Sequence, residues 1–343
     1  MEIFFFQGNV PIPQVYQRDQ KTAEADVSEH DPVLASQVVQ GLRVEPEGRY
    51  LDGTLGLGGH TLGLLKACSS SPRVLGLDRD GRSLAEAARR IRAEGFSDNV
   101  SLVQARFSRF PEVMRQLGWK DLHGALLDLG VSSYQLESAE RGFGLHQDGP
   151  LDMRLDAESG KDTAADLVNG ADADRLRDII RDYGEEPLAE RIARNIVNRR
   201  GHGFFRSTAQ LADAVKEAYP AKWRRTARRH PATRTFQALR IAVNEELEEL
   251  SMFLRYIPDF LCPGARVAVI SFHSLEDRLV KWAFRRAAKG CVCPQEQAVC
   301  TCEGRPSLRL VHKKPITPSA EEIEQNRRSR SAKMRLAEAP ENQ

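Results

Sequence analysis

The chain has 343 residues, a formal net charge of +2, 41% hydrophobic residues and 29% charged residues. This composition is typical of a soluble protein with a sizeable core, and a nucleic-acid surface would have to arise from local clusters of charge. No apolar run approaches the roughly 20 residues that cross a bilayer, and the start of the chain lacks the basic leader of a signal peptide, so we expect a cytoplasmic protein.

Strands and helices alternate in the first part of the chain. Residues 1–28 show no periodicity and are expected to be a disordered extension. After them the predicted strands are 49–52, 73–78, 100–104 and 124–128. A helix starts near Thr61, and another covers 81–94. This alternation predicts a parallel sheet with helical crossovers.

The middle of the chain has a different pattern. No strand is expected between 138 and 229, and helices are predicted at 172–182, 187–200 and 208–219, the last capped by Ser207. The alternation then returns, with a strand at 265–270, a helix at 274–288 and a last strand at 307–311. Six apolar residues before that strand fall on one helical face: Phe236, Leu239, Val243, Leu247, Leu250 and Leu254.

These patterns predict a discontinuous core with an insert. The predicted parts are a first core segment 29–137, a helical insert 138–229, a second core segment 230–335 with a cysteine-rich loop at 291–302, and a tail 336–343.

A glycine-rich turn follows the first strand. Residues 52–60 read DGTLGLGGH, and Asp78 ends the next strand. Glycines let a backbone approach a ligand closely, and an acid about 20 residues further on accepts ribose hydroxyls in nucleotide-binding folds. Thr61 replaces the last glycine of the dinucleotide fingerprint, and Asp52 suits the cationic end of S-adenosylmethionine. The alternative is a tight turn that binds no ligand.

Two further polar loops follow strands. Asp128 ends the fourth strand ahead of Ser132 and Ser133, and residues 271–278 follow the fifth. Ligands bind beyond the carboxyl ends of parallel strands, so these loops are expected at one crevice. Methyl transfer to an amine needs positioning and hydrogen-bond acceptors. The candidates that could supply them are Asp128, Ser132, Ser133, Ser271 and His273.

Structural roles for the same residues stay open. The serines could form turns or helix caps, and Ser274 with Asp277 predicts a capping box. His273 could be a base or a structural histidine.

Together these residues resemble one family, the bacterial 16S rRNA cytosine-N4 methyltransferases named RsmH or MraW. The matching motifs span about residues 30–335 and are HDPVL (30–34), DGTLGLGGH (52–60), DLGVSS (128–133), ERGF (140–143), DGPLDMR (148–154), YGEE (183–186), HPATRTFQ (230–237) and SFHSLEDR (271–278).

The resemblance implies an α/β fold, a class I S-adenosylmethionine methyltransferase (Rossmann-like) sheet with an inserted all-helical domain for substrate recognition. It implies methylation of the N4 amine of a cytidine in the decoding centre of 16S rRNA. The cofactor contacts that it implies are Gly58, Gly59, His60, Asp78, Phe107, Asp128 and Gln135. The chain reads DLGV at 128–131 where amino-methyltransferases commonly have Pro-Pro and an aromatic residue, so the acceptor that orients the amine stays open.

Two basic runs and a cysteine cluster stand outside these motifs. Residues 222–230 carry five Lys and Arg with Trp223, and residues 327–335 form the second run. We expect both to contact RNA phosphates; solvated charge is the alternative. Two Cys-x-Cys pairs, Cys291, Cys293, Cys300 and Cys302, could hold a structural zinc ion or remain four reduced thiols.

The sequence disfavours three other functions. A DNA amino-methyltransferase should carry the Pro-Pro motif, and Thr61 and Asp52 disfavour a nicotinamide oxidoreductase. A catalytically silent RNA-binding or ribosome-assembly protein would not need Asp52, Asp78 and Asp128 together. The expected partner is 16S rRNA or the small ribosomal subunit rather than DNA or a membrane, and the oligomeric state stays open.

Overall fold

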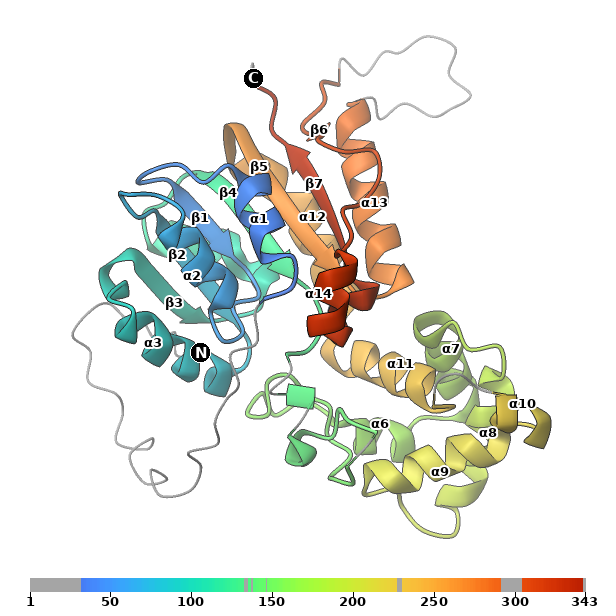
Figure 1. Ribbon diagram of the computed structural model, residues 1–343. Helices are drawn as coiled ribbons and strands as arrows, with labels where there is room; N and C mark the ends of the chain where they lie inside the picture. Colours follow the sequence, from blue (N-terminus) through green and yellow to red (C-terminus); the bar gives the residue numbers. More distant parts are fainter. Residues whose placement is uncertain are drawn as a thin grey trace, which may run out of the picture. The chain divides into compact units, whose positions relative to one another are not determined.

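The computed structural model describes residues 32–132, 135–136, 138–145, 147–226, 230–290 and 304–341. The chain divides into two compact units (Figure 1). We call Met1–Gly130 with Glu249–Gln343 the sheet unit and Val131–Glu248 the helical unit. The expected extension 1–28 lies outside the described residues.

The sheet unit contains a seven-stranded sheet in the order β3-β2-β1-β4-β5-β7-β6. Its strands are β1 (Arg49–Asp52), β2 (Arg73–Asp78), β3 (Val100–Gln104), β4 (Leu122–Asp128), β5 (Leu261–Ser271), β6 (Arg309–Leu310) and β7 (Lys333–Glu338). The pairs among β1 to β5 are parallel, and β7 runs antiparallel to both β5 and β6. The predicted Rossmann-like α/β sheet is therefore confirmed.

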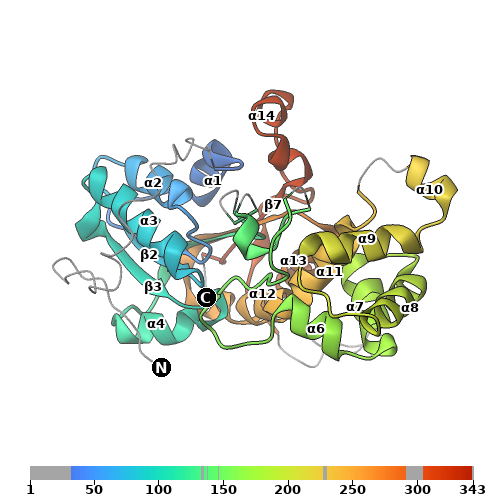
Figure 2. The same ribbon diagram turned by 90° about the horizontal axis from the view of Figure 1, so that it is seen from below.

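Helices cover both faces of this sheet (Figure 2). One apolar cluster joins the sheet to α1 (Ala35–Leu42), α2 (Gly59–Lys66) and α3 (Gly81–Ala93). The other joins it to α4 (Phe110–Gln116), α12 (Glu246–Tyr256) and α13 (Ser274–Lys289). Along β5, Val267 and Val269 enter one cluster and Ala268 and Ile270 the other, because successive side chains of a strand point to opposite faces.

The end of the chain differs from the prediction. A polar tail was expected from 336, but β7 lies between β5 and β6 and is largely buried. Met334 and Leu336 alternate with charged residues and pack in the sheet core, which is the pattern of a strand. The charges are neutralised in place, since Arg335 Nε lies 2.7 Å from a carboxylate oxygen of Asp277. A short helix, α14 (Ala320–Gln325), precedes this strand.

The helical unit consists of α6 (Ala164–Gly170), α7 (Ala173–Gly184), α8 (Ala189–Arg200), α9 (Thr208–Ala218), α10 (Ala221–Thr226) and α11 (Thr233–Asn244), around an apolar core of its own. Ser207 forms a capping box with Gln210 at the start of α9, so the predicted cap is confirmed. Asp172 likewise caps α7 through the backbone N–H of Arg175 at 2.8 Å.

The helical unit extends beyond the predicted insert of 138–229 because α11 belongs to it. Phe236 and Leu239 of α11 join the core of the helical unit, whereas Leu250 and Leu254 of α12 join the core of the sheet unit. The two helices are separated at Glu245, whose φ of 55° is left-handed and ends α11. The single helical face predicted from the sequence thus serves two cores.

In the part of the chain described by the structure, no helix combines the length and the apolar character that crossing a membrane would require.

Candidate functional site

The turn between β1 and α2 surrounds a buried carboxylate. The Asp52 side chain accepts a hydrogen bond from the Thr61 hydroxyl at 2.8 Å and from the Thr54 backbone N–H at 3.3 Å. Burial raises the pKa of Asp52, while the charge of His60 and the bond from Thr61 oppose that rise. The threonine that departs from the dinucleotide fingerprint therefore holds the acid that precedes the turn.

The glycines of this turn have backbone conformations that other residues rarely adopt. Gly56 has a φ of 53° and Gly58 a φ of 79°. Gly58 is the N-cap residue of α2, and a Cβ atom on it would lie 3.4 Å from that of Ala87 in α3. Gly58 and Gly59 thus bring backbone to the start of a helix, where N–H groups favour an anion or a polar ligand.

Asp78 lies beside this turn because β2 pairs with β1. Its carboxylate accepts the Gly56 backbone N–H at 2.7 Å and the Asp80 backbone N–H at 2.9 Å. Burial raises the pKa of Asp78 to about 6, although both hydrogen bonds favour the charged form. The glycine turn and the acid, predicted to share a ligand, are in direct contact.

His60 and Asp128 form a second polar pair across the ends of α2 and β4. His60 Nε2 lies 3.5 Å from Asp128 Oδ2, and the Asp128 backbone N–H donates to the Thr54 hydroxyl at 2.6 Å. Burial lowers the pKa of His60, but the nearby carboxylates of Asp128 and Asp52 raise it overall. Strands β1 and β4 flank the point where the strand order reverses, which is the usual place for a ligand in such sheets.

Two buried polar atoms at this pair lack a hydrogen bond among the residues described: His60 Nε2 and Asp128 Oδ1. Buried polar atoms are rarely left without a partner, and leaving one costs about 1–3 kcal/mol. A bound ligand would remove that cost. These atoms therefore support a ligand site at the ends of β1 and β4.

Phe107 stands next to the same strand ends. It follows β3, is half-buried, and contacts Phe253 edge to face at a centroid distance of 5.9 Å. A Cβ atom on Gly53, just after β1, would lie 3.0 Å from Phe107 Cβ. Of the predicted cofactor contacts, the sheet unit thus gathers Gly58, Gly59, His60, Asp78, Phe107 and Asp128.

Gln135 and Ser132 belong to the helical unit and bind each other. The Ser132 backbone N–H donates to Gln135 Oε1 at 3.0 Å, and the Gln135 backbone N–H donates to Ser132 Oγ at 3.2 Å. This reciprocal pair is the geometry of a helix cap. Ser133 lies outside the described residues.

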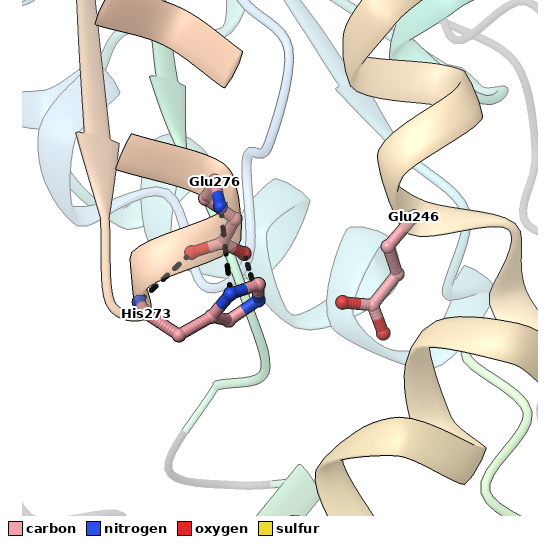
Figure 3. A group of neighbouring side chains, drawn as sticks. All are labelled: Glu246, His273 and Glu276. Atoms are coloured by element: carbon pink, nitrogen blue, oxygen red, sulfur yellow. Dashed lines mark hydrogen bonds and ion pairs between the residues drawn. The ribbon is translucent and has the colours of Figure 1, made fainter. Parts of the chain in front are cut away.

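Most polar groups of the loop after β5 bind within the protein, but His273 Nε2 is buried near Glu276 without a hydrogen bond among the described residues. The Ser271 hydroxyl donates to the Lys333 backbone carbonyl at 3.2 Å. His273 is the N-cap of α13: its Nδ1 accepts the Glu276 backbone N–H at 3.4 Å, and Glu276 accepts the backbone N–H of His273 (Figure 3). Glu276 also accepts the backbone N–H of Phe272 at 2.8 Å. A histidine whose Nδ1 accepts carries its proton on Nε2 when neutral, so neither nitrogen is a free base in this conformation.

The predicted capping box of Ser274 and Asp277 is wrong. Ser274 is already the first residue of α13, and His273 has the extended backbone of a cap residue, with φ −136° and ψ 166°. Asp277 instead binds Arg335, with Lys333 at 3.4 Å. Burial would raise its pKa, but these two cations hold the pKa of Asp277 below its usual range.

The two basic runs, 222–230 and 327–335, differ in how their side chains are placed. Trp223 in α10 is 47% exposed, and residues 227–229 of the first run lie outside the described residues. In the second run, Lys333 and Arg335 face Asp277, while Arg327, Arg328 and Arg330 are exposed. The four cysteines of the predicted zinc cluster, Cys291, Cys293, Cys300 and Cys302, also lie outside the described residues.

Thr54 is a site residue that the sequence reasoning missed. Its backbone N–H binds Asp52, and its hydroxyl binds the backbone of Asp128, so it links the ends of β1 and β4. The contact with Asp52 follows the two-residue spacing of an Asx turn and could have been found from the DGT triplet, whereas the contact with Asp128 spans 74 residues and gives no local signal.

Comparison with known proteins yields consistent matches. The sequence profile of the MraW methylase family matches residues 27–340. A protein of Solidesulfovibrio magneticus named ribosomal RNA small subunit methyltransferase H is 57% identical over 309 residues, covering 90% of this chain and 95% of the relative. Relatives with the same name from Oleidesulfovibrio alaskensis and Lawsonia intracellularis are 50% and 48% identical, each over 90% of this chain and over 94% and 98% of their own lengths.

Proposed function

The chain belongs to the MraW methylase family, and on that premise we propose that it methylates the N4 amine of one cytidine in the decoding centre of bacterial 16S rRNA. S-adenosylmethionine is the methyl donor. The observation that carries the proposal is the group of three carboxylates, Asp52, Asp78 and Asp128, around one glycine turn.

The residues present suit S-adenosylmethionine. Asp78 ends β2, where a carboxylate accepts the two hydroxyls of a ribose. Phe107 offers a ring face or edge for an adenine, with core packing as its other role. Gly58 and Gly59 form the start of α2, where backbone N–H groups suit the amino-acid part, and the buried acid Asp52 and the partly buried Asp128 suit a cation. The donor supplies an electrophilic methyl group.

The protein's task in this chemistry is to position and desolvate an amine. The lone pair of a cytosine amine is delocalised into the ring, so an acceptor that pulls on an N–H makes the nitrogen a better nucleophile. Asp128 is the group that we assign to this task, because its Oδ1 is buried and lacks a hydrogen bond within the described residues. His60, at 3.5 Å, holds the other oxygen.

The other predicted site residues are proposed to shape the two loops beside the reacting group. Ser132 and Ser133 shape the loop after β4, with Gln135 holding Ser132. Ser271 and His273 shape the loop after β5, where they are bound to backbone groups. A base taken out of its stack is read by polar groups on its Watson–Crick edge, which such loops can supply. The helical unit is proposed to recognise the RNA, and the protein to act in the cytoplasm.

The test uses small ribosomal subunits from cells that lack this protein. Purified protein and S-adenosylmethionine should produce N4-methylcytidine in their 16S rRNA, detected by mass spectrometry of nucleosides. Subunits from cells that contain the protein are the control and should accept no further methyl. Methylation of DNA or free cytidine in place of the subunits would contradict the proposal, and binding without methylation would favour the catalytically silent RNA-binding protein.

We also propose a structural zinc ion at Cys291, Cys293, Cys300 and Cys302. The support is the sequence alone: four thiolates complete a tetrahedral site and leave no open position for substrate. Elemental analysis of protein purified without chelators should give about one zinc per chain. A metal-free protein of full stability would contradict it.

A further inference from the structure

One face of α13 is buried in the sheet unit. Val280 and Phe284 are fully buried in the apolar core, and Glu276 of the same helix is buried at its start. The helix packs against β5, β6 and β7. This anchored face fixes which side chains of α13 point to solvent.

The opposite face is basic and carries one large aromatic ring. Arg278, Trp282, Arg285 and Lys289 follow one another at spacings of four, three and four residues, which places them along one stripe of the helix. Lys281 and Arg286 flank this stripe. Trp282 is 67% exposed. We call these six residues the α13 face.

Four of the cations of the α13 face have no ion-pair partner among the described residues. Both acids of α13, Glu276 and Asp277, stand in its first turn and are used in the cap and by Arg335. Lys281, Arg285, Arg286 and Lys289 form no ion pair with any residue that the structure describes.

Other helices of this chain are different. Arg89 in α3 pairs with Glu86, Arg177 in α7 with Asp174, and Arg194 in α8 with Glu190, each at three or four residues along the helix. Like charges at such spacings, as in Lys281 with Arg285, destabilise a helix slightly. Arg286 and Lys289 stand in the last turn of α13, where the helix dipole favours cations, but the dipole does not account for Lys281 or for an exposed tryptophan within the row.

We propose that the α13 face binds a single-stranded segment of the RNA substrate. Several cations without an acid suit the phosphates of a polyanion, and an exposed tryptophan offers a stacking surface that any unpaired base can use. The stripe from Arg278 to Lys289 covers eleven steps of about 1.5 Å, roughly 17 Å, so it contacts more than one nucleotide. The inference rests on the proposed function for the identity of the RNA.

The charge test compares two triple variants with the same change in net charge. The first is Arg285→Gln, Arg286→Gln and Lys289→Gln. The matched control is Arg92→Gln, Arg115→Gln and Lys120→Gln, three exposed cations of the sheet unit outside α13. Glutamine keeps the helix propensity of the residues that it replaces, so thermal melting should be unchanged in both.

Binding is measured by fluorescence anisotropy with a labelled single-stranded RNA, from 50 to 200 mM salt. The slope of log affinity against log salt should fall by about 2 in the α13 variant, since each lost phosphate contact of a single strand contributes about 0.7. The control variant should keep the wild-type slope. If the α13 variant bound RNA as well as the wild type, the proposal would be wrong, and an acidic protein surface would remain as the occupant of the α13 face. If both variants lost the same affinity, the loss would come from net charge and not from the α13 face.

The aromatic test separates stacking from charge. Trp282→Ala should weaken RNA binding by roughly 5- to 150-fold, the range for loss of one stacked base, whereas Trp282→Phe should stay near wild type. Equal affinities of the alanine variant and the wild type would remove the tryptophan from the proposal.

Methylation of small subunits is followed in the same variants, so that the two proposals can fail separately. A wild-type protein that binds RNA through α13 but leaves the subunits unmethylated would refute the proposed function and not the α13 face. Full methylation and RNA binding by the α13 triple variant would refute the α13 face and not the function.

Discussion

The ends of β1, β2 and β4 and the end of β5 carry similar numbers of polar side chains but use them differently. At the first group, Asp78 binds two backbone N–H groups, and Asp128 keeps a buried oxygen that has no partner among the described residues. At the end of β5, each oxygen-bearing side chain has a partner: Ser271 binds a strand carbonyl, Glu276 binds two N–H groups and Asp277 binds cations. The buried atom without a hydrogen bond there is His273 Nε2, on a ring whose Nδ1 serves the helix cap.

This difference separates ligand chemistry from fold maintenance. Polar residues after a parallel strand are a general sign of a site, but only groups with spare hydrogen-bonding capacity can serve a ligand. The first group has that capacity, together with carboxylates whose pKa burial has raised. The β5 loop holds the start of α13 in place.

The largest effect is expected at Asp128. Asp128→Ala removes the assigned acceptor and the partner of His60, so single-turnover methylation of small subunits should fall on the order of 100-fold or more. Asp98→Ala, at an exposed acid between α3 and β3, is the control and should keep wild-type rates. Cofactor affinity is measured separately by calorimetry. A rate within a few-fold of wild type would move the acceptor role to another group.

The next effect concerns Asp78 and pH. Asp78→Asn should cost about 1.5–3 kcal/mol of cofactor binding by weakening charge-assisted hydrogen bonds. The free wild-type carboxyl has a pKa of about 6, so cofactor affinity should fall about tenfold from pH 7 to pH 5, as the carboxylate that binds ribose is protonated. The asparagine variant should show no such step. Calorimetry across this range measures both, and a wild-type profile without a step would contradict the assignment.

The same shift has a defined sign for stability. The pKa of Asp78 is raised above its unfolded value of about 3.9, so the folded protein holds the proton more tightly than the unfolded chain. The ligand-free protein should therefore lose stability as pH rises from about 4 to about 6, and Asp78→Asn should remove this contribution. Urea unfolding at several pH values would show it.

The smallest effect on cofactor binding is expected at Glu276, where a substitution should mainly lower the stability of the protein. Glu276→Ala leaves the N–H groups of Phe272 and His273 without their acceptor and should lower the free energy of unfolding by about 1–3 kcal/mol. Cofactor affinity should stay within a few-fold of wild type. Glu324→Ala, an exposed acid in α14, is the matched control. If Glu276→Ala left stability unchanged but abolished methylation, the β5 loop would belong to the reacting site. The contrast between the β5 end and the ends of β1, β2 and β4 would then be wrong.

Local signals in the sequence were enough for the framework. The strands at 49–52, 73–78 and 100–104 were predicted with the bounds that the structure shows, because each has apolar residues at its centre and clear breaks on both sides. The glycine turn and Asp78 could be paired in advance because consecutive parallel strands of this type place their ends together. The cap at Ser207 follows a rule that spans three residues.

What required the tertiary structure is whatever depends on distant partners. β7 alternates apolar and charged residues, and its charged side chains can enter the sheet because Asp277 neutralises Arg335 and the neighbouring strands pair its backbone. Apolar spacing over 236–254 could not show that a left-handed Glu245 divides the face between two cores. Whether Ser271, His273 or Asp128 keeps a free acceptor depends on distant partners, 62 residues away for Ser271 and Lys333 and 74 for Asp128 and Thr54. Sequence spacing records which groups are present, and only packing decides which of them remain available to a ligand.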